Sequence, residues 1–343
     1  MNKTSGIIWM MAVALAGCTQ PPPAASGTAG VPSTAPATAA APEPVYSPPT
    51  PQVPAQAMAS LQANSAYWIS NRVHGRNGWD TNGVRATFSS MKWSLESNWP
   101  ITRNTNCWLH GVKGLTAISP FNRQGAYHGP ATAVTPRHVV MVTHMRLQPG
   151  TVVEFATMDN QIVSRKLVAH SDSKQIPDFS IGLLDADLPP SIGFMRIVPP
   201  LWRQIMPEAF QPRRPGSHPS NRSPAEVHPL VGFNHWKQAF VADFAVSGVL
   251  LDKSVWFPDW FGRAAGGDSG HPLCLLANDE LFLITLFTTP AGGQLYPDRI
   301  TLINGEMEEL SLAHKAPVYR LTVAGELMRF KPQPVESGGG PAN

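Results

Sequence analysis

The sequence GGDSGHP occupies residues 266–272, and the apolar run PLCLLA continues from it at residues 272–277. A serine that acts as a nucleophile needs an exposed position on a rigid turn, with backbone N–H groups nearby to hold a developing oxyanion. Glycines on both sides of Ser269 permit such a turn and let a substrate approach the backbone. A glycine-rich turn without chemistry is the alternative. The partners of this serine must therefore be sought elsewhere in the chain.

The same stretch resembles the Gly-Asp-Ser-Gly-Gly-Pro signature of trypsin-like (chymotrypsin-fold) serine peptidases, with His271 as the one departure. It differs from the G-x-S-x-G elbow of the α/β-hydrolases, because residue 271 is not glycine and strand residues follow instead of a helix. Because the matching positions run in register, the resemblance favours Ser269 as a nucleophile over a plain turn. It also implies that the backbone N–H groups of Gly267 and Ser269 form the oxyanion hole.

A general base is expected in the run TAVTPRHVVMVTH at residues 132–144, which resembles the same family's strand ending in Thr-Ala-Ala-His. Aligned without gaps, His144 falls on the base, and Val142-Thr143 replace the alanine pair. His138 then lies within the strand, where we expect a structural or surface residue. A lone histidine is more often structural than catalytic, so the assignment of His144 depends on the serine motif.

A buried carboxylate should fix the tautomer of the base and stabilise its protonated form. Residues 176–184 (IPDFSIGLL) offer it, because Asp178 precedes an apolar strand pattern that resembles the family's Asp-Ile-Ala-Leu-Leu element. Asp172, Asp185 and Asp187 lie at turn-like positions, where we expect solvated loop acids.

The order His144, Asp178, Ser269 is that of the chymotrypsin clan, and it differs from the order in subtilisin and in the α/β-hydrolases. The resemblance therefore implies a serine endopeptidase in which His144 takes the serine proton and water hydrolyses an acyl-enzyme on Ser269. A protein or peptide is the implied substrate, and the reaction needs no cofactor. The chain shows no metal-ligand spacing such as H-E-x-x-H, so we expect no metal.

Short β-rich runs separated by turn residues predict an all-β fold, either a sandwich or a barrel. The resemblance covers residues 105–330 and implies two six-stranded antiparallel β-barrels of chymotrypsin type, with the active site in the cleft between them. Barrel 1 would span about residues 105–198 and barrel 2 about 230–330. We expect strands at residues 151–156, 162–169, 179–184, 240–251 and 281–288, and a hairpin that pairs 273–276 with 281–286.

The first 17 residues have the layout of a secretory signal peptide, with Lys3 before an apolar run at residues 6–16 that is too short to span a bilayer. Residues 15–18 (LAGC) resemble a bacterial lipobox, which implies that Cys18 is lipidated and anchors the chain to the membrane. An ordinary signal peptide with a chance cysteine is the alternative. Because Thr19 rather than aspartate follows, the resemblance to Gram-negative lipoproteins implies the outer membrane of the cell envelope.

Residues 18–58 are expected to form a disordered tether. The segment 20–57 holds 11 prolines and one charged residue, Glu43, so it cannot bury enough apolar surface to order itself. Residues 331–343 are expected to form a disordered tail. The leader at residues 59–104, which contains Trp68 and Trp79, is expected to begin with a short helix at 59–69 and to pack outside the domain without a chemical role.

Charged residues make up 14% of the chain, with 26 Lys+Arg against 23 Asp+Glu and a net charge of +3. The usual share is ~25%, and the small basic excess is scattered, which argues against a nucleic-acid partner. Three cysteines are too few for a disulfide-dense scaffold or a four-cysteine zinc site. Cys107 and Cys274 either form a disulfide or remain two buried thiols. We expect a monomer.

The residues expected around Ser269 depart from the trypsin pattern. Trypsin-type enzymes bury a freed N-terminus against the aspartate before the nucleophile, but no Ile-Val-Gly-Gly-like start is present, so Asp268 should have an internal partner, expected to be an arginine. Arg263, six residues before the serine, would either form a basic specificity pocket or point outward. Thr288 and Thr289 would belong to the strand that pairs with substrate.

A second interpretation is a catalytically inactive pseudoprotease, in which the barrel pair serves as an envelope binding or adhesion module. His271 and the altered pair Val142-Thr143 support it, whereas the intact histidine, aspartate and serine set argues against it. Esterase activity of the same three residues is a third interpretation.

Overall fold

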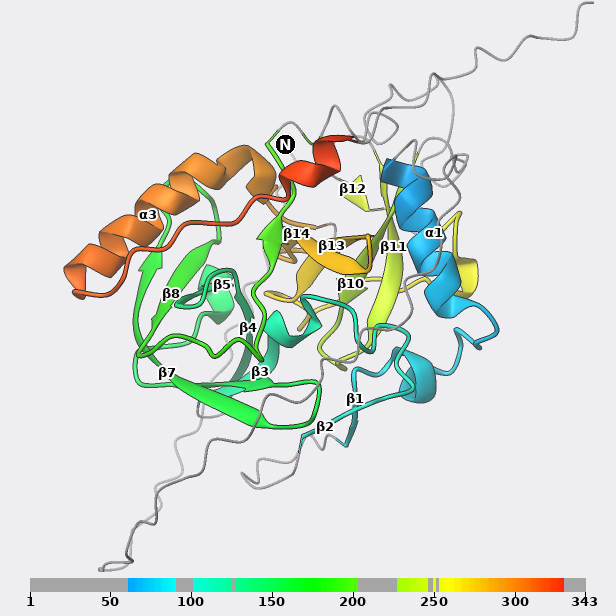
Figure 1. The fold of residues 1–343 in the computed structure, drawn as a ribbon, viewed down its shortest axis with the longest axis horizontal. Helices are drawn as coiled ribbons and strands as arrows, with labels where there is room; N and C mark the ends of the chain where they lie inside the picture. Colours follow the sequence, from blue (N-terminus) through cyan, green and yellow to red (C-terminus); the bar gives the residue numbers. More distant parts are fainter. Residues whose placement is uncertain are drawn as a thin grey trace, which may run out of the picture. The chain divides into compact units, whose positions relative to one another are not determined.

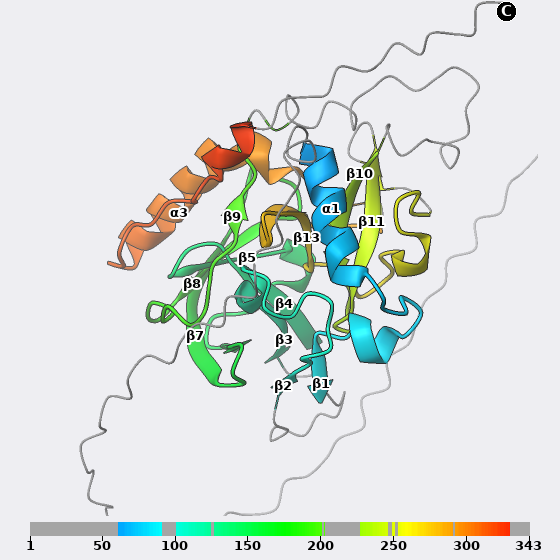
Figure 2. The same cartoon turned by 45° about the vertical axis from the view of Figure 1, so that its right-hand side comes forward.

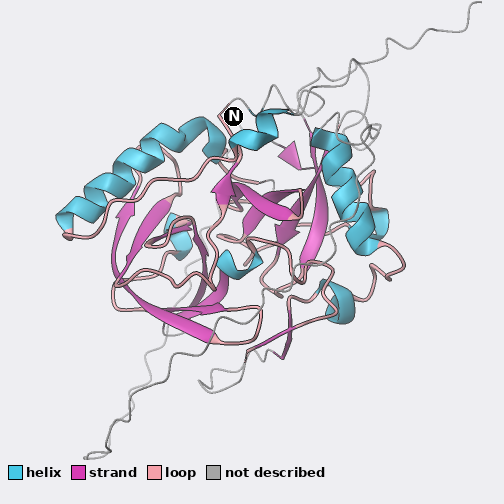
Figure 3. Ribbon diagram, viewed as in Figure 1, coloured by secondary structure: helices cyan, strands magenta, loops and turns pink. Residues whose placement is uncertain are grey.

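The computed structural model describes residues 61–90, 101–124, 127–200, 202, 227–245, 249–250, 253–290 and 292–329. The predicted signal peptide, Cys18, the tether and the tail at 331–343 lie outside the described residues. The described part is mostly β, with two six-stranded sheets and a two-stranded one (Figures 1 and 3). No helix within it is long and apolar enough to cross a membrane.

The first six-stranded sheet is a nearly closed antiparallel barrel with the strand order β3-β4-β5-β8-β7-β6. Its outer strands meet, because Ser119 Oγ donates to the Glu154 carbonyl at 2.5 Å and the Glu154 N–H donates to Asn122 Oδ1 at 2.9 Å. This confirms the mostly β prediction and the first barrel. The strands are β3 (Ile118–Gln124), β4 (Tyr127–Ala133), β5 (His138–Met141), β6 (Val152–Ala156), β7 (Ile162–Asp172) and β8 (Ser180–Leu184).

The second sheet has the order β12-β11-β10-β13-β14-β9, and its pairs are antiparallel except for the parallel pair β14 and β9. The predicted hairpin is confirmed as β13 and β14, and its turn residues Asn278 and Asp279 both have positive φ, as a tight hairpin turn requires. Closure of this sheet into a second barrel stays a prediction, since the described residues show no pairing of β12 with β9. The strands are β9 (Arg196–Ile197), β10 (His228–Phe233), β11 (Ala239–Ala245), β12 (Val249–Leu250), β13 (Pro272–Ala277) and β14 (Glu280–Leu286).

Within the residues that the structure describes, two long helices flank the sheets. The predicted leader helix is α1 (Leu61–Val73), which packs on β10 and β13 (Figure 2), and Ser65 Oγ donates to the Pro229 carbonyl at 3.0 Å. The second helix, α3 (Ile300–Ala313), packs on β7 and β8. No secondary structure was predicted for residues 300–313, so this helix was missed.

The rest of the leader contacts both sheets. Thr87 donates through its N–H and its hydroxyl to the Lys237 carbonyl, both at 2.8 Å, just before β11. Arg103 lies in β2 (Thr102–Arg103), which pairs with β1 (Phe88–Ser90), and it donates to the Ala156 carbonyl of β6 at 2.7 Å. The leader thus does more than cover the outside of one sheet, because its residues bridge the two.

Candidate active site

His144 and Asp178 come together because their strands are neighbours. β5 and β8 pair antiparallel with Met141 opposite Ser180, so the residues after β5 lie beside those before β8. His144 lies on the short turn Thr143–Met145, and its Nδ1 is 2.7 Å from Asp178 Oδ2. The His144 N–H also donates to Asp178 Oδ1 at 3.0 Å. One carboxylate therefore orients both the backbone and the ring of this histidine.

This contact determines which ring nitrogen is available for chemistry. A carboxylate at Nδ1 favours the tautomer that carries its proton there, which leaves Nε2 as the base. The side chains of His144 and Asp178 are 47% and 28% exposed, so the pair is open to a substrate from outside. The exposure also means that Asp178 is only partly buried, whereas we expected a buried carboxylate.

Asp178 adopts a backbone conformation that is uncommon for a residue with a side chain, with φ at +55°. Its carbonyl accepts the Thr143 N–H at 3.3 Å, while its carboxylate accepts the next N–H along the chain. Strained backbone of this kind persists where surrounding contacts hold it in place, and such positions concentrate at functional sites.

Asp172 is exposed, as expected of a solvated acid, but it lies at the end of a strand instead of in a loop and takes part in a hydrogen-bond network near His144. It ends β7, and it accepts a hydrogen bond from Ser180 Oγ. Ser180 Oγ in turn lies 3.1 Å from Thr143 Oγ1, and Arg146 Nε lies 3.4 Å from Asp172. The turn that carries His144 is therefore fastened to β7 and β8 as well as to Asp178.

Asp185 and Asp187 also make specific contacts. Asp185 accepts the Lys166 N–H at 3.0 Å. Asp187 pairs with Arg137 at 3.3 Å and accepts the Tyr319 hydroxyl. These bonds lie on the barrel surface, and neither carboxylate contacts His144.

His138 has the structural role that we expected. It is fully buried, with Nδ1 at 2.9 Å from Thr135 Oγ1 and Nε2 at 2.9 Å from Ser311 Oγ of α3. Burial lowers its pKa to about 4, so the ring stays neutral. Both nitrogens are engaged, which leaves none for catalysis.

Ser269 lies on the turn before β13. Along this turn, every second backbone N–H group donates a hydrogen bond. Those of Asp268 and Gly270 donate to the carbonyls of Ala265 at 3.1 Å and Phe287 at 2.8 Å. Within the described residues, the N–H groups of Gly267 and Ser269 have no acceptor. The turn requires glycine at 267 and 270, where φ is +97° and +82°. An oxyanion site needs two such unused N–H groups, here the serine's own and that of Gly267, next to the nucleophile.

The serine turn and the histidine turn pack against each other across the two sheets. A Cβ atom on Gly270 would lie 2.8 Å from Pro130 Cγ and 3.4 Å from Val142 Cγ2, two residues before His144. Only a glycine lets the segments approach so closely. Phe179, next to Asp178, packs edge-on against Tyr296, which follows β14, with ring centroids 5.0 Å apart. The predicted site residues therefore come from both sheets to one region.

The expected hydrogen bond between the serine and the histidine is not formed. In the part of the protein that it describes, Ser269 Oγ makes no hydrogen bond, whether to His144 or to another residue. Such bonds are often long in the absence of substrate and shorten only in the reacting complex. The histidine–aspartate contact is thus formed, and the serine contact is not.

Asp268 has a histidine partner, so the expected arginine was wrong. Asp268 Oδ1 accepts the His235 N–H at 2.7 Å and faces its ring Nδ1 at 2.5 Å, while Oδ2 accepts the Ala265 N–H at 2.7 Å. His235 lies in the turn between β10 and β11. Because β10 runs antiparallel beside β13, its end lies next to the residues that precede β13. That strand register is the signal that could have found His235.

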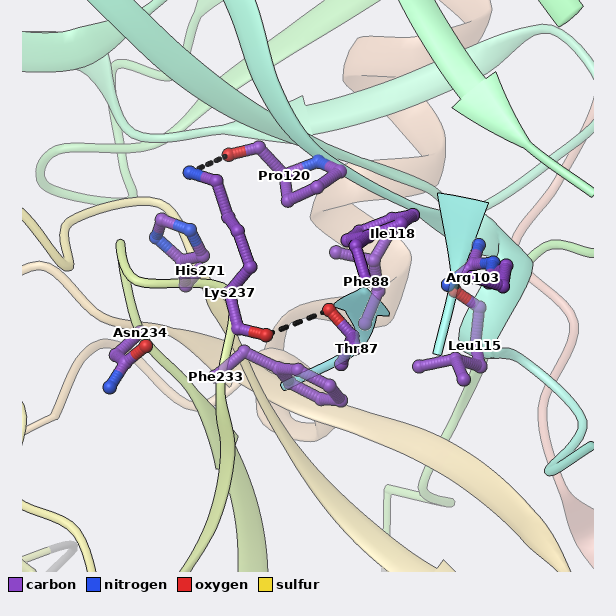
Figure 4. A pocket seen from close by; sticks show the side chains of 10 residues that line it. All are labelled: Thr87, Phe88, Arg103, Leu115, Ile118, Pro120, Phe233, Asn234, Lys237 and His271. Carbon is purple, nitrogen blue, oxygen red and sulfur yellow. Dashed lines mark hydrogen bonds between the residues drawn. The ribbon is translucent and has the colours of Figure 1, made fainter. Parts of the chain in front are cut away.

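His271, the departure from the family signature, faces the interior rather than a substrate. It is 2% exposed, its Nδ1 lies 3.1 Å from the Asp268 carbonyl, and burial lowers its pKa to about 3. It borders a cavity of about 10 Å³ next to Lys237, whose Nζ donates to the Pro120 carbonyl at 3.0 Å (Figure 4). Burial lowers the pKa of Lys237 to about 7. The cavity has the room of one water molecule.

The expected specificity residues differ in the hydrogen bonds that they make. Arg263 is exposed. The N–H groups of Thr288 and Thr289 donate to the Gly292 carbonyl at 3.2 and 3.0 Å, and their hydroxyls lie 3.2 Å from the same oxygen. The Thr289 carbonyl in turn accepts the Gly292 N–H at 3.0 Å. These two residues therefore form a tight turn, and of their backbone groups the Thr288 carbonyl remains for pairing with a substrate.

The two described cysteines are free thiols, so the Cys107–Cys274 disulfide is absent and the alternative of two buried thiols is confirmed. Burial raises the pKa of Cys107 to about 11 and raises that of Cys274 further. Neither has the character of a nucleophile. Within the described residues, no group of three or more metal-ligating side chains is assembled.

No protein-family model and no curated protein sequence matches the chain. Among solved structures, it resembles a mutant of human heparin binding protein, with 12% sequence identity and a TM-score of 0.38, over 59% of this chain and 94% of that chain. It also resembles human heparin binding protein at 12% identity and a TM-score of 0.36, over 56% of this chain and 93% of that one. Similarity at this level assigns neither an activity nor a ligand.

Proposed function

We propose that the chain is a serine endopeptidase with a double-barrel fold of chymotrypsin type, acting through His144, Asp178 and Ser269. One observation carries the proposal: the Asp178 carboxylate holds both the N–H and the Nδ1 of His144. A carboxylate in that position keeps Nε2 available as a base and stabilises the ring when it becomes charged. The close packing of Gly270 against Val142 supports the placement of the serine turn beside this base.

In the proposed reaction, a peptide carbonyl lies against the Gly266–Ser269 turn. His144 Nε2 takes the Ser269 proton as Oγ attacks the carbonyl carbon, and the oxyanion accepts hydrogen bonds from the N–H groups of Gly267 and Ser269. His144 then gives its proton to the leaving amine. Water, deprotonated by the same nitrogen, releases the acyl group and restores Ser269.

The proposal extends to the place where the protein works. A lipid on Cys18 would anchor a monomer to the outer membrane of a Gram-negative cell envelope, and the tether at 18–58 would let the enzyme reach protein or peptide substrates. The support is the signal layout of residues 1–18 and the proline content of the tether. Expression with alkyne-tagged palmitate tests it: wild type should be labelled and sediment with membranes, and Cys18→Ser should do neither.

The second function is a catalytically inactive binding module. The absent hydrogen bond between Ser269 Oγ and His144 among the described residues favours it. The contact between His144 and Asp178 favours the enzyme, because a binding module has no need of an oriented imidazole.

Labelling with a fluorophosphonate probe, followed by peptide mass mapping, distinguishes the two. Wild type should carry the probe on Ser269, and Ser269→Ala or His144→Ala should abolish labelling and hydrolysis of a casein substrate. Ser89→Ala and His314→Ala, which change an exposed serine and an exposed histidine away from the site, should behave as wild type. A folded wild-type protein that never reacts would establish the binding module instead.

A further inference from the structure

Asp268 is a buried carboxylate next to the nucleophile, and its environment is specific. The side chain is 2% exposed and accepts three hydrogen bonds, two of which come from His235. A buried charge is costly unless donors compensate it, so the position of Asp268 depends on its donors. The carboxylate therefore links the serine turn to the turn between β10 and β11.

His235 also touches the oxyanion residue itself. A Cβ on Gly267 would lie 3.5 Å from His235 Cγ, so the imidazole lies against the backbone whose N–H we assign to the oxyanion site. The Trp236 ring packs on the imidazole with centroids 4.6 Å apart, and the His235 side chain is 22% exposed. A single side chain thus bonds to Asp268 and lies beside Gly267, the two residues that precede the serine.

The other titratable groups near Asp268 have different bonds. Lys237 Nζ donates to the Pro120 carbonyl at 3.0 Å, and His271 Nδ1 faces the Asp268 backbone carbonyl. The carboxylate of Asp268 makes its ion pair with His235. The side-chain hydrogen bond to the carboxylate thus comes from His235, Ala265 contributes a backbone N–H, and the Lys237 ammonium attracts the carboxylate electrostatically.

We propose that His235 is a positioning residue that holds the Gly267–Ser269 turn, through Asp268, in the arrangement that stabilises the oxyanion. This inference rests on the proposed serine hydrolase function. It makes the oxyanion site a product of contacts within the folded chain, so the turn forms without a newly cut N-terminus.

Two substitutions at residue 235 distinguish the effect of the hydrogen bond to Asp268 from the effect of the packing of the ring. His235→Phe keeps a ring beside Gly267 and Trp236 and keeps the backbone N–H, but it removes the side-chain donor to Asp268. His235→Asn keeps a side-chain donor near the place of Nδ1. The second-order rate of fluorophosphonate labelling, and kcat and KM for a peptide ester, are measured on the full chain. Asp243→Asn is the control, because Asp243 is also buried and bonded by Ser254 and Val255, away from the serine.

We expect labelling and kcat to fall about tenfold or more in His235→Phe, with KM nearly unchanged, because a misplaced oxyanion donor weakens the transition state rather than binding. His235→Asn should stay within about threefold of wild type. Asp243→Asn should lower the melting temperature without changing either rate. In His235→Phe/Asp268→Asn, the loss should be no greater than in the slower single variant, since both changes break one contact.

If His235→Phe does not fold, His235→Ala is measured with and without free imidazole, and recovery of labelling by imidazole supports the same conclusion. The inference fails if folded His235→Phe labels like wild type, if His235→Asn is as slow as His235→Phe, or if imidazole restores nothing. Failure of the proposed function looks different, because wild-type Ser269 would then not react at all.

Discussion

Replacing Gly270 by alanine should damage both stability and activity, and a second glycine gives the matched control. Gly270 has φ at +82° and no room for a Cβ, which would lie 2.8 Å from Pro130 Cγ. Gly111 has the same φ of +82°, and nothing lies within 4 Å of its Cβ position. The two substitutions therefore impose the same backbone strain and differ in steric overlap.

The left-handed conformation costs a residue with a Cβ about 1–2 kcal/mol, so Gly111→Ala should lose about that much stability. Overpacking adds about 1–3 kcal/mol, which Gly270→Ala should lose in addition. The overlap would also push the serine turn away from Val142. We expect labelling of Ser269 to slow in Gly270→Ala and to be unchanged in Gly111→Ala.

Urea unfolding followed by circular dichroism measures the free energies, and equal slopes for all three proteins make the midpoints comparable. The rate of fluorophosphonate labelling reports whether Ser269 keeps its position on the turn. Equal stability of the two variants, together with equal labelling, would refute the packing of the serine turn against the histidine turn.

Three further predictions concern single groups. Asp178→Asn should lower kcat about 10³–10⁴-fold with little loss of stability, because the amide favours the wrong tautomer of His144; steady-state kinetics on a peptide ester measure this, and a tenfold effect or less would contradict the assigned role. The pKa of Lys237 is lowered to about 7, so above that pH the unfolded chain binds one more proton than the native protein, and native stability should rise with pH up to the ordinary lysine range. That rise, at most about 1.4 kcal/mol per pH unit, should be missing in Lys237→Met when urea titrations at pH 7 and 9 are compared, and parallel pH profiles would contradict it. Cys107 and Cys274 should react with a thiol reagent only after denaturation, so rapid native-state reaction of either would show that its burial is wrong.

The sequence allowed accurate predictions where the information is local. The turn Asn278-Asp279 between two apolar runs predicted the hairpin of β13 and β14, because those residue types tolerate positive φ. The motifs around His144 and Asp178 were each short and continuous, and the structure places the two side chains in contact.

Long-range contacts were harder to predict. His235 lies 33 residues from Asp268, and nothing near either residue indicates the pairing, which follows from the register of β10 on β13. Helix α3 was missed, because no secondary structure was assigned to this stretch, although Ile300, Ile303, Met307 and Leu310 repeat at helical spacing. For His235, the missing information was which distant strand lies opposite.

The contacts of the leader with both six-stranded sheets limit how the two sheets can move apart. Thr87 is bonded to Lys237, and Arg103 donates to β6, so one short stretch of backbone is attached to each half. A hinge motion that parted the sheets at this edge would have to break the buried Arg103 bonds first, and an unpaired guanidinium in the interior is expensive. Separation of the two sheets at this edge would therefore break the bonds of the leader to one of them, so loop rearrangement is the less costly way to admit a substrate.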